Sequence, residues 1–509
     1  MKVLKFGGTS VGSPENIKKA GKVLLGLPKE ELSVIVVSAM GGVTDLLVSC
    51  SGKAAKGALS DNGDAYQQIF SAIEQKHIAA IRELIPVKAQ SSVMSQTKML
   101  LNNLEDILKG VYLVKELSPK SYDYILSFGE RLSTIVVTAY FNTIIEGTQA
   151  VDSRELISTD KDFGNAKVDF AKTNQQISSY FSDKTGLFIC PGFIAATADG
   201  ETTTLGRGGS DYSAAIFAAA LKATQLEIWT DVNGIMTADP RLVRSSHSIS
   251  KISYEDAMEL SHFGAKVIYP PSIQPVLDAR IPIVIKNTLL PENTGTLVTF
   301  DATANGDLIR GVSSVKDIVL INLSGSGMVG IPSFSYRLFK ALSEHRINII
   351  LITQASSEHT ICVAIDEKDS ENACEAINAE FSYEMASHQI DPVEIEKDLV
   401  IVALVGSGMK EKAGISGKMF DTLSKNGISV KAIAQGSSER NISAVISKRH
   451  LKKALNSLHE SFFLSGKKVM NLFIVGVGNV GRELIDQLRR QRQYLSENEQ
   501  IELRLIGIA

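Results

Sequence analysis

The sequence predicts an α/β fold, in which a three-layer αβα sandwich around a largely parallel sheet precedes two small α+β modules and an incomplete dinucleotide-binding unit. Three observations predict this order. Short apolar runs that end in small or polar residues alternate with helical patterns over the first 300 residues. A longer segment then occurs twice at an offset of 81 residues. Finally, a glycine-rich turn lies between a strand and a helix near the C-terminal end.

Composition excludes several classes of protein. Of the 509 residues, 44% are hydrophobic and 21% are charged, which is a globular balance and excludes global disorder. A formal net charge of −3 lacks the basic field of a nucleic-acid-binding protein. No apolar run approaches the ~20 residues of a membrane helix, and residues 1–6 are too short for a signal peptide. The four cysteines form no CxxC pair, so we expect a cytoplasmic protein with structural cysteines.

The first 300 residues alternate between strands and helices. The predicted strands are 34–37, 187–190 and 226–229, because each run is apolar throughout, as in strands that are buried on both faces. Between residues 45 and 127, Leu101, Leu104 and Leu108 follow a helical period, which predicts a helical insertion. In parallel sheets, ligands bind at the carboxyl ends of the strands, where the glycine-rich turns fall here.

Residues 319–365 and 400–446 repeat each other at an offset of 81 residues without a gap. Matched positions include Gly325 with Gly406, Phe339 with Phe420, and Gln354 with Gln435. Each copy predicts a βαββ-type unit, and two copies form a pair of modules rather than a solenoid. A duplication that serves packing alone is the alternative. Against it, the matched glutamines and serines follow the second strand of each copy, where packing of a core does not require polar residues.

The last 40 residues predict the start of a Rossmann unit. A strand at 471–475 precedes Gly476, Gly478 and Gly481, and a helix at 482–490 follows, which is the context that a GxGxxG motif requires. A second strand is predicted at 501–508. The acidic residue that binds the ribose should lie about 20 residues further on, and a whole dinucleotide fold needs well over 100 residues, so we expect an incomplete unit here.

Two glycine-rich segments predict an anion site. Lys5, Gly7 and Gly8 combine a point charge with backbone amides that can approach phosphate oxygens closely, although an ordinary tight turn has the same pattern. The Walker A pattern occurs nowhere. In the second segment, three glycines frame Arg207 and Asp211. Arginine suits bidentate binding of a carboxylate, and the alternative is a structural ion pair within the loop.

A third motif runs from Thr230 and Asp231, where a strand ends, to Arg241. Polar residues after a strand suit a nucleotide base and ribose, and a surface turn with a helix cap is the alternative. Lys266 alone is most simply a solvated charge. The triplet 162–164 imitates the metal motif of protein kinases, but the partner motifs of such kinases are absent. The eight histidines show no metal spacing and no arrangement with a nucleophile, so we predict no protein metal site.

Together these segments resemble the aspartokinases of the amino-acid kinase family. Their motifs occur in the order KFGGTSV (5–11), SAMGGVTD (38–45), FGERLS (128–133), LGRGGSDYSA (205–214) and WTDVNG…ADPR (229–241). The repeats resemble paired ACT regulatory modules, and the last residues resemble the beginning of homoserine dehydrogenase. The resemblance implies an amino-acid kinase fold over 1–300, ACT modules at 313–390 and 391–465, and a Rossmann start at 469–509.

The resemblance implies transfer of the ATP γ-phosphoryl group to the β-carboxylate of L-aspartate. A carboxylate is already ionised near neutral pH, so positioning and charge neutralisation suffice without a general base. The implied catalytic residues are Lys5 and Asp211, and the implied aspartate-binding residues are Ser38, Thr44, Glu130 and Arg207. The implied nucleotide-binding residues are Gly7, Gly8, Thr230, Asp231, Met236, Arg241 and Lys266. Met236 departs from the family, which often has tyrosine there, but methionine can still pack on an apolar face.

Mg²⁺ is expected as MgATP, with no protein ligand named, and NAD(P) only in the missing dehydrogenase part. The ACT pair implies feedback by an end-product amino acid, threonine in related enzymes, with lysine left open. The implied effector contacts are Ile352, Gln354, Ile433 and Gln435. ACT modules usually pair across subunits, so a homodimer or larger assembly is expected. Neither nucleic acid nor membrane is an expected partner.

Two rival functions remain at the level of sequence. One is an amino-acid sensor with a decayed catalytic domain, which the presence of Lys5, Arg207 and Asp211 disfavours. The other is a related acyl-phosphate kinase for glutamate or a carbamate-type substrate, which the FGERLS and GRGGSD motifs disfavour. Dehydrogenase activity is not expected from this chain, which looks truncated early in that second enzyme.

Overall fold

A computed structural model describes residues 1–26, 33–57, 64–264, 268–300, 308–325, 333–354, 360–436, 440–464, 468–497, 499 and 501–509. The chain divides into two compact units. The first unit comprises Met1–Ile235, Ser248–His262 and Lys266–Thr303, and the second comprises Met236–His247, Phe263–Ala265 and Ala304–Ala509. Two short segments of the N-terminal part therefore pack with the second unit.

An eight-stranded sheet forms the centre of the first unit, in the order β3-β5-β2-β1-β8-β10-β11-β9. Its strands are β1 (Lys2–Phe6), β2 (Ser33–Val37), β3 (Gln149–Ala150), β5 (Leu187–Pro191), β8 (Leu226–Thr230), β9 (Lys251–Ser253), β10 (Ile283–Asn287) and β11 (Thr296–Thr299). Every pair is parallel except β10 with β11. The three strands predicted from apolar runs are β2, β5 and β8, and the largely parallel sheet is confirmed.

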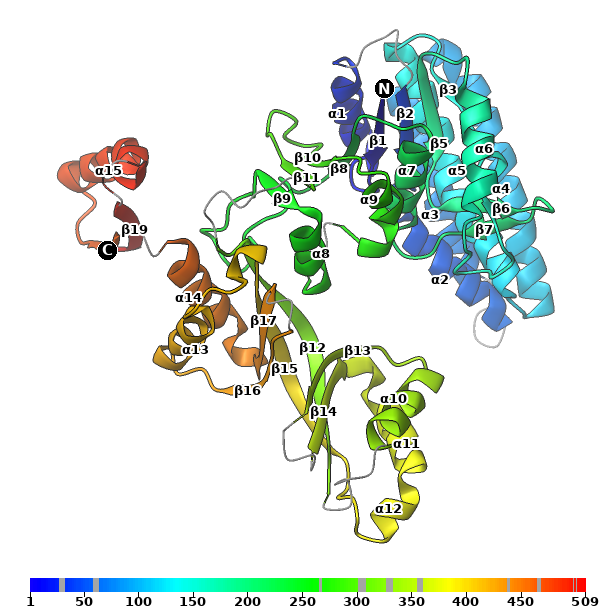
Figure 1. The fold of residues 1–509 in the computed structure, drawn as a ribbon. Helices are drawn as coiled ribbons and strands as arrows, with labels where there is room; N and C mark the ends of the chain where they lie inside the picture. Colours follow the sequence, from blue (N-terminus) through cyan, green and yellow to red (C-terminus); the bar gives the residue numbers. More distant parts are fainter. Residues whose placement is uncertain are drawn as a thin grey trace. The chain divides into compact units, whose positions relative to one another are not determined.

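Helices cover both faces of this sheet (Figure 1). They are α1 (Pro14–Leu24), α2 (Val43–Lys56), α3 (Asp64–Leu84), α4 (Val87–Val114), α5 (Pro119–Ile144), α6 (Phe170–Phe181), α7 (Gly209–Ala220), α8 (Tyr254–His262) and α9 (Gln274–Asp278). Leu4, Phe6 and Ile35 share one hydrophobic core with α1 to α5. On the other face α7 contacts β1 and β2, and Phe181 of α6 lies edge-on to Phe188 of β5. The three-layer sandwich and the helical insertion are therefore confirmed.

Smaller elements complete the first unit. A three-stranded sheet contains β4 (Ser158–Thr159), β6 (Ile194–Thr197) and β7 (Thr202–Thr204). Short 3₁₀ turns lie at η2 (Ser153–Glu155) and η3 (Pro270–Ile273). Asp123 of α5 ties these elements together, because its carboxylate accepts the backbone N–H groups of Gly164 and Thr204, each at 2.9 Å. The triplet 162–164 thus has a structural contact here.

A six-stranded sheet runs through the second unit in the order β13-β14-β12-β15-β17-β16. The first module contains β12 (Gly311–Ser324), α10 (Phe334–Glu344), β13 (Ile349–Gln354), β14 (Thr360–Asp366), η5 (Glu367–Asp369), α11 (Ser370–Glu380) and α12 (Ser382–Ala386). The second contains β15 (Glu394–Val405), η6 (Ser407–Met409), α13 (Ile415–Lys425), β16 (Val430–Ala434), β17 (Asn441–Ser447), η7 (Lys448–His450) and α14 (Leu451–Phe463). In each module a helix, α11 or α14, follows the last strand, and the predicted βαββ pattern does not include it.

The two modules join along β12 and β15, which pair antiparallel with an irregular register between Val315 and Ile318. Asp317 and Asp398 both have positive φ, at 55° and 58°, and they are related by the repeat offset. Aspartate is one of the few residues that tolerates this conformation. The outer strands of a flat six-stranded sheet would lie about 24 Å apart. Cα atoms of β13 and β16 nevertheless approach within 8 Å, so the sheet bends strongly.

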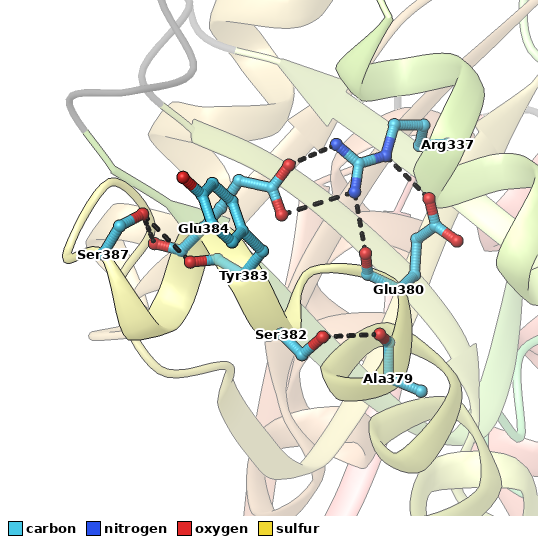
Figure 2. A network of polar contacts seen from close by, with 7 residues as sticks. All are labelled: Arg337, Ala379, Glu380, Ser382, Tyr383, Glu384 and Ser387. Carbon is cyan, nitrogen blue, oxygen red and sulfur yellow. Dashed lines mark hydrogen bonds and ion pairs between the residues drawn. The ribbon is translucent and has the colours of Figure 1, made fainter.

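An arginine on α10 ties the helices of the first module together (Figure 2). The Nε atom of Arg337 donates to Glu380 of α11 at 2.6 Å, and its terminal nitrogens donate to Glu384 of α12. The guanidinium also lies 4.7 Å from the ring centroid of Phe381. Hydrogen bonds from Arg337 lower the pKa of Glu384 below its ordinary value, which keeps this cluster ionised. Arg337 therefore fixes α12, an element that the second module lacks.

The last segment forms a small βαβ unit of β18 (Lys468–Ile474), α15 (Asn479–Glu497) and β19 (Ile501–Ile508). β18 and β19 pair parallel, which is the strand, turn and helix context predicted for the glycine motif. Several apolar side chains here face solvent, with Val475 85% and Val480 84% exposed. Within the described residues, no helix has the length and apolar character needed to cross a membrane.

Candidate functional site

The carboxyl ends of four neighbouring strands meet at one edge of the large sheet. Phe6 of β1 is in register with Val37 of β2 and with Trp229 of β8, and Thr230 is in register with Asn287 of β10. The glycine turn after β1, the serine after β2 and the polar turn after β8 therefore leave the sheet at the same level. The structure thus brings these motifs of the first unit together, as the strand rule predicts.

A buried ion pair lies at this edge. The Nζ atom of Lys5, a residue only 9% exposed, lies 2.6 Å from Oδ1 of Asp211. Asp211 occupies the first turn of α7, which begins after Gly208 at φ 71°. Free amides and the helix dipole favour negative charge at such an N-terminus. The pair therefore fixes a lysine ammonium group where the backbone also attracts anions.

Glycines at the edge permit close approach of two loops. Gly7 donates its N–H to the carbonyl of Trp229 at 3.0 Å, and a Cβ there would lie 3.4 Å from Lys5 Nζ. A Cβ at Gly8 would lie 3.1 Å from the Ala39 carbonyl oxygen, and one at Gly41 would lie 3.1 Å from that of Gly8. The glycines are thus needed for space. Their bare backbone leaves room for a ligand beside Lys5.

Glu130 of α5 brings a buried carboxyl group to the loop that follows β2. Its Oε1 accepts the N–H of Ala39 at 3.1 Å, whereas its Oε2 is buried with no hydrogen-bond partner in the structure. Burial raises the pKa of Glu130 to about 8, although the bond from Ala39 opposes this shift. Ser38 and Thr44 lie half-buried on the same loop and the first turn of α2. This corner therefore offers a carboxyl group that a bound cation would ionise.

Arg207 is exposed just before α7, and its guanidinium lies 5.4 Å from the ring centroid of Tyr269. A Cβ at Gly208 would lie 3.0 Å from Cδ1 of that ring, so the glycine lets the loop lie against Tyr269. Arg207 and Asp211 thus stand on either side of one tight turn. The arginine presents a planar cation to solvent, which suits a carboxylate ligand.

The predicted nucleotide residues fall into three groups. Thr230 and Asp231 lie at the sheet edge, where the threonine hydroxyl donates to the Asp231 carboxylate at 3.2 Å. Met236 and Arg241 belong to the segment that packs with the second unit, and Arg241 donates to Asp239 through Nε and Nη2 at 3.0 and 2.9 Å. Lys266 lies outside the described residues. Their predicted contacts with a nucleotide stay a prediction.

Sequence reasoning missed several polar groups at this edge. The Ser10 hydroxyl lies 2.7 Å from that of Thr288, which directly follows β10, and both residues are buried. Lys286 of β10 lies 4.9 Å from the ring centroid of Trp229. The signal was present in the sequence, because the apolar run of β10 ends in Lys-Asn-Thr in the way that the runs of β2 and β8 end in polar residues.

Two supporting contacts had no signal in the sequence. Lys76 of α3 donates to the carbonyl of Gly41, so the helical insertion holds the loop after β2. A Cβ at Gly192 would lie 2.7 Å from Cβ of Ser210, and the next residue, Phe193, has φ 66°. The turn after β5 thus supports the first turn of α7. Both contacts join residues far apart in the chain, which periodicity cannot reveal.

The predicted effector residues lie on the outer strands of the second sheet or, for Gln435, directly after one of them. Ile352 and Ile433 are 49% and 47% exposed, and Gln354 and Gln435 are also exposed. Gln435 lines a cavity of about 240 Å³ in the second module, with Met409, Lys412 and Ile415 among the other lining residues. Ser416 donates to Oε1 of Gln435 at 3.2 Å. The sequence prediction therefore places one of its four residues at this cavity.

The glycine motif of the terminal unit also shows the expected close packing. Gly476 has φ 92°, and a Cβ at Gly481 would lie only 2.0 Å from the Gly476 carbonyl oxygen. Gly478, between them, has open space around it. Within the described ranges, no group of three or more His, Cys, Asp or Glu residues is placed to hold a metal ion.

Comparisons with known proteins agree with this arrangement. Residues 1–287 match the model of the amino acid kinase family, and residues 321–381 and 402–462 each match that of the ACT domain. The bifunctional aspartokinase/homoserine dehydrogenase of Haemophilus influenzae is 36% identical over 515 residues, which cover 100% of this chain and 62% of that protein. The chain thus spans less than two thirds of the length of this relative.

This chain covers a larger share of a shorter relative and of a solved structure. Aspartokinase 1, chloroplastic, of Arabidopsis thaliana is 31% identical over 471 residues, which cover 91% of this chain and 80% of that protein. The crystal structure of E. coli aspartokinase III in complex with aspartate and ADP (R-state) has a TM-score of 0.76 and 28% identity. The match covers 91% of this chain and 100% of that one.

The burial of Glu130 predicts a pH dependence of stability. Its ordinary pKa of 4.5 rises to about 8 in the folded chain, so the folded state binds more protons than the unfolded state between these values. Stability should therefore fall as pH rises from 5 to 8, by up to roughly 1.4 kcal/mol per pH unit from this group. Urea unfolding at several pH values should show this slope in the wild type and a smaller one in Glu130→Gln. Equal slopes would contradict the buried, neutral carboxyl group.

Proposed function

Since the chain belongs to the amino acid kinase family and has aspartokinases among its relatives, we propose that it is an aspartokinase. It would transfer the γ-phosphoryl group of ATP to the β-carboxylate of L-aspartate and form 4-phospho-L-aspartate. The observation that carries this proposal is the largely buried ion pair of Lys5 with Asp211 beside the turn at Gly7 and Gly8, which has no side chain to block a ligand. That arrangement suits a polyphosphate chain.

The proposed reaction needs no general base. The attacking β-carboxylate oxygen is already an anion near neutral pH, so no proton has to be removed before the P–O bond forms. Lys5 Nζ would neutralise charge on the transferring and leaving oxygens, and the amide of Gly8 would donate to the phosphates. Gly7, whose N–H is bonded to the Trp229 carbonyl, would leave room for them. Asp211 holds the ammonium group in place, which makes it a positioning partner for Lys5 and for cations of the substrate.

Recognition of L-aspartate is assigned to the corner between α5 and α7. Arg207 would bind a carboxylate of the substrate in a bidentate manner, with Ser38 and Thr44 as further hydrogen-bonding groups. Glu130 would bind the ammonium group. Its high pKa supports this role, because a cation beside the orphan Oε2 would favour the ionised form. The bound ammonium group would then give Oε2 of Glu130 the partner that it lacks in the structure.

Mg²⁺ would enter as part of MgATP, and we assign it no protein ligand. The nucleotide would follow the edge past Thr230 and Asp231. Arg241, Met236 and Lys266 complete the proposed nucleotide set. Residues 469–509 correspond in this proposal to the beginning of a homoserine dehydrogenase part. The complete form of such a part would use NAD(P).

We also propose feedback by an amino acid, with threonine as the first candidate, at the modules that match the ACT domain. The cavity beside Gln435 supports a small polar ligand, because it combines the Gln435 amide with an apolar wall from Met409 and Ile415. The exposed outer strands that carry Ile352 and Ile433 support assembly into a homodimer or larger. Four free cysteines support a cytoplasmic location.

Replacing Arg207 tests the substrate assignment. ADP release by the wild type should depend on L-aspartate and should not occur with L-glutamate. Arg207→Ala should raise the KM for aspartate roughly 30-fold, which corresponds to about 2 kcal/mol for a lost charge-assisted bidentate contact, and should change the KM for ATP far less. Steady-state kinetics with a coupled ADP assay measures both constants.

The control for this variant is Arg82→Ala, which removes an exposed arginine on α3 and should leave both constants unchanged. Equal effects of Arg207→Ala on the two KM values would contradict its role. No ADP release with any amino acid would favour a catalytically silent sensor, and turnover with glutamate in place of aspartate would favour a related acyl-phosphate kinase.

Replacing Gln435 tests the effector assignment. Gln435→Ala should raise the threonine concentration that half-inhibits the kinase by 5- to 150-fold, the range of a coupling energy of about 1–3 kcal/mol, while the uninhibited rate stays the same. Lys431→Ala, which removes an exposed lysine of the preceding strand β16 together with its ion pair to Glu396, is the control. Unchanged inhibition by threonine in both Gln354→Ala and Gln435→Ala would contradict this effector site. Stronger inhibition of the wild type by lysine than by threonine would identify lysine as the effector.

A further inference from the structure

The chain after the polar turn of β8 forms a closed loop within the second unit. The N–H of Thr237 donates to the carbonyl of His247 at 2.9 Å, and the N–H of His247 donates back to the Thr237 hydroxyl at 3.1 Å. We call residues 237–247 the docked loop. It carries Arg241, and Met236 directly precedes it, so two residues proposed for the nucleotide site are held by this loop.

The docked loop is built into the core of the second module. Val243 and Ala238 are buried in the same hydrophobic cluster as Met409, Ile415 and Leu458. The backbone is also bound, because Val312 of β12 donates its N–H to the Thr237 carbonyl at 2.8 Å. The amide of Asn456 on α14 donates to the carbonyl of Leu242 at 2.9 Å. Apolar packing and backbone hydrogen bonds therefore both attach the loop.

His459 on α14 is the polar centre of this attachment. Its side chain is fully buried, with Nε2 2.9 Å from the Thr237 hydroxyl and Nδ1 3.2 Å from the Ser245 hydroxyl. The imidazole stacks on Phe463 at 4.8 Å between centroids. Burial lowers the pKa of His459 to about 4, with further lowering by His247 and Arg504, so the ring is neutral at pH 7. A neutral ring has one donor and one acceptor, which the two hydroxyls can satisfy together.

The internal repeat shows that the module itself does not need this histidine. At the repeat offset of 81 residues, His459 corresponds to Asn378 of α11, which is exposed. Phe463 corresponds likewise to Ser382, whose hydroxyl donates to the carbonyl of Ala379 near the end of α11 (Figure 2). The first module is thus folded without a buried histidine at this place. The histidine therefore serves the docked loop that the second module alone carries within the described residues.

We propose that His459 is a positioning residue that holds Arg241 and Met236 for the nucleotide and couples their placement to the second module. The proposal rests on the proposed kinase function. The coupling has a contiguous physical route, because Met409 and Ile415 line the cavity beside Gln435 and share one core with Val243 of the docked loop. A ligand that moves this wall changes the packing on which the loop rests. Asp239 then orients Arg241 within the loop.

The test compares three variants of the full chain. His459→Phe keeps a ring on Phe463 and removes both hydrogen bonds. It should raise the KM for ATP at least 5-fold, with less than 2-fold change in the KM for aspartate. His459→Gln, which can still reach Thr237, should restore most of the affinity for ATP. Asn378→Phe, the same change at the matched position of the first module, should leave both constants unchanged.

A second readout does not depend on catalysis. Amide hydrogen exchange should become at least 10-fold faster at residues 242–246 in His459→Phe and stay unchanged in α7, and thermal unfolding should show that the variant is folded. Faster exchange without any kinase activity in the wild type would support the anchoring and reject the proposed function. Unchanged exchange, or equal effects on the two KM values without rescue by His459→Gln, would overturn the positioning role.

Discussion

One buried ion pair, between Lys5 of β1 and Asp211 of α7, determines what the sheet edge of the first unit can bind. A lysine ammonium group in this position needs a fixed anionic partner, and the first turn of α7 supplies it where the helix dipole already favours a carboxylate. This first turn of α7 requires Gly208 at positive φ and close contact between Ser210 and Gly192. The surrounding glycines thus follow from the need to bring two loops and the first turn of α7 close to one lysine ammonium group.

The two repeated modules of the second unit differ in the segment that their helices hold. Its two modules share one bent sheet, joined along β12 and β15, and each closes with a helix over the same kind of core. In the first module Arg337 of α10 binds glutamates of α11 and α12 and so fixes α12. In the second module His459 of α14 binds the docked loop. Matched positions of the two modules therefore hold different added segments on the same kind of core.

Much of the fold could be predicted because local patterns determine it. β2, β5 and β8 are apolar runs with polar ends, and the repeat predicts two modules through its matched glycines. Lys5, Gly7, Ser38 and Thr230 could be placed at one edge because parallel strands end together. The polar end of the β10 run, at Thr288, had the same signal and was missed. Lys76 on Gly41 and the docking of 237–247 on His459 could not be predicted. Each joins elements that only the tertiary fold brings together, and neither has a spacing that would signal it.

A crystal structure of the 509-residue chain with a non-hydrolysable ATP analogue, Mg²⁺ and L-aspartate is the most direct measurement. It should show γ-phosphate oxygens within about 3 Å of Lys5 Nζ and of the Gly8 amide, with the β-carboxylate of aspartate in line with the phosphorus atom. A triphosphate bound far from both Lys5 and the turn that carries Asp211 would contradict phosphoryl transfer at this edge.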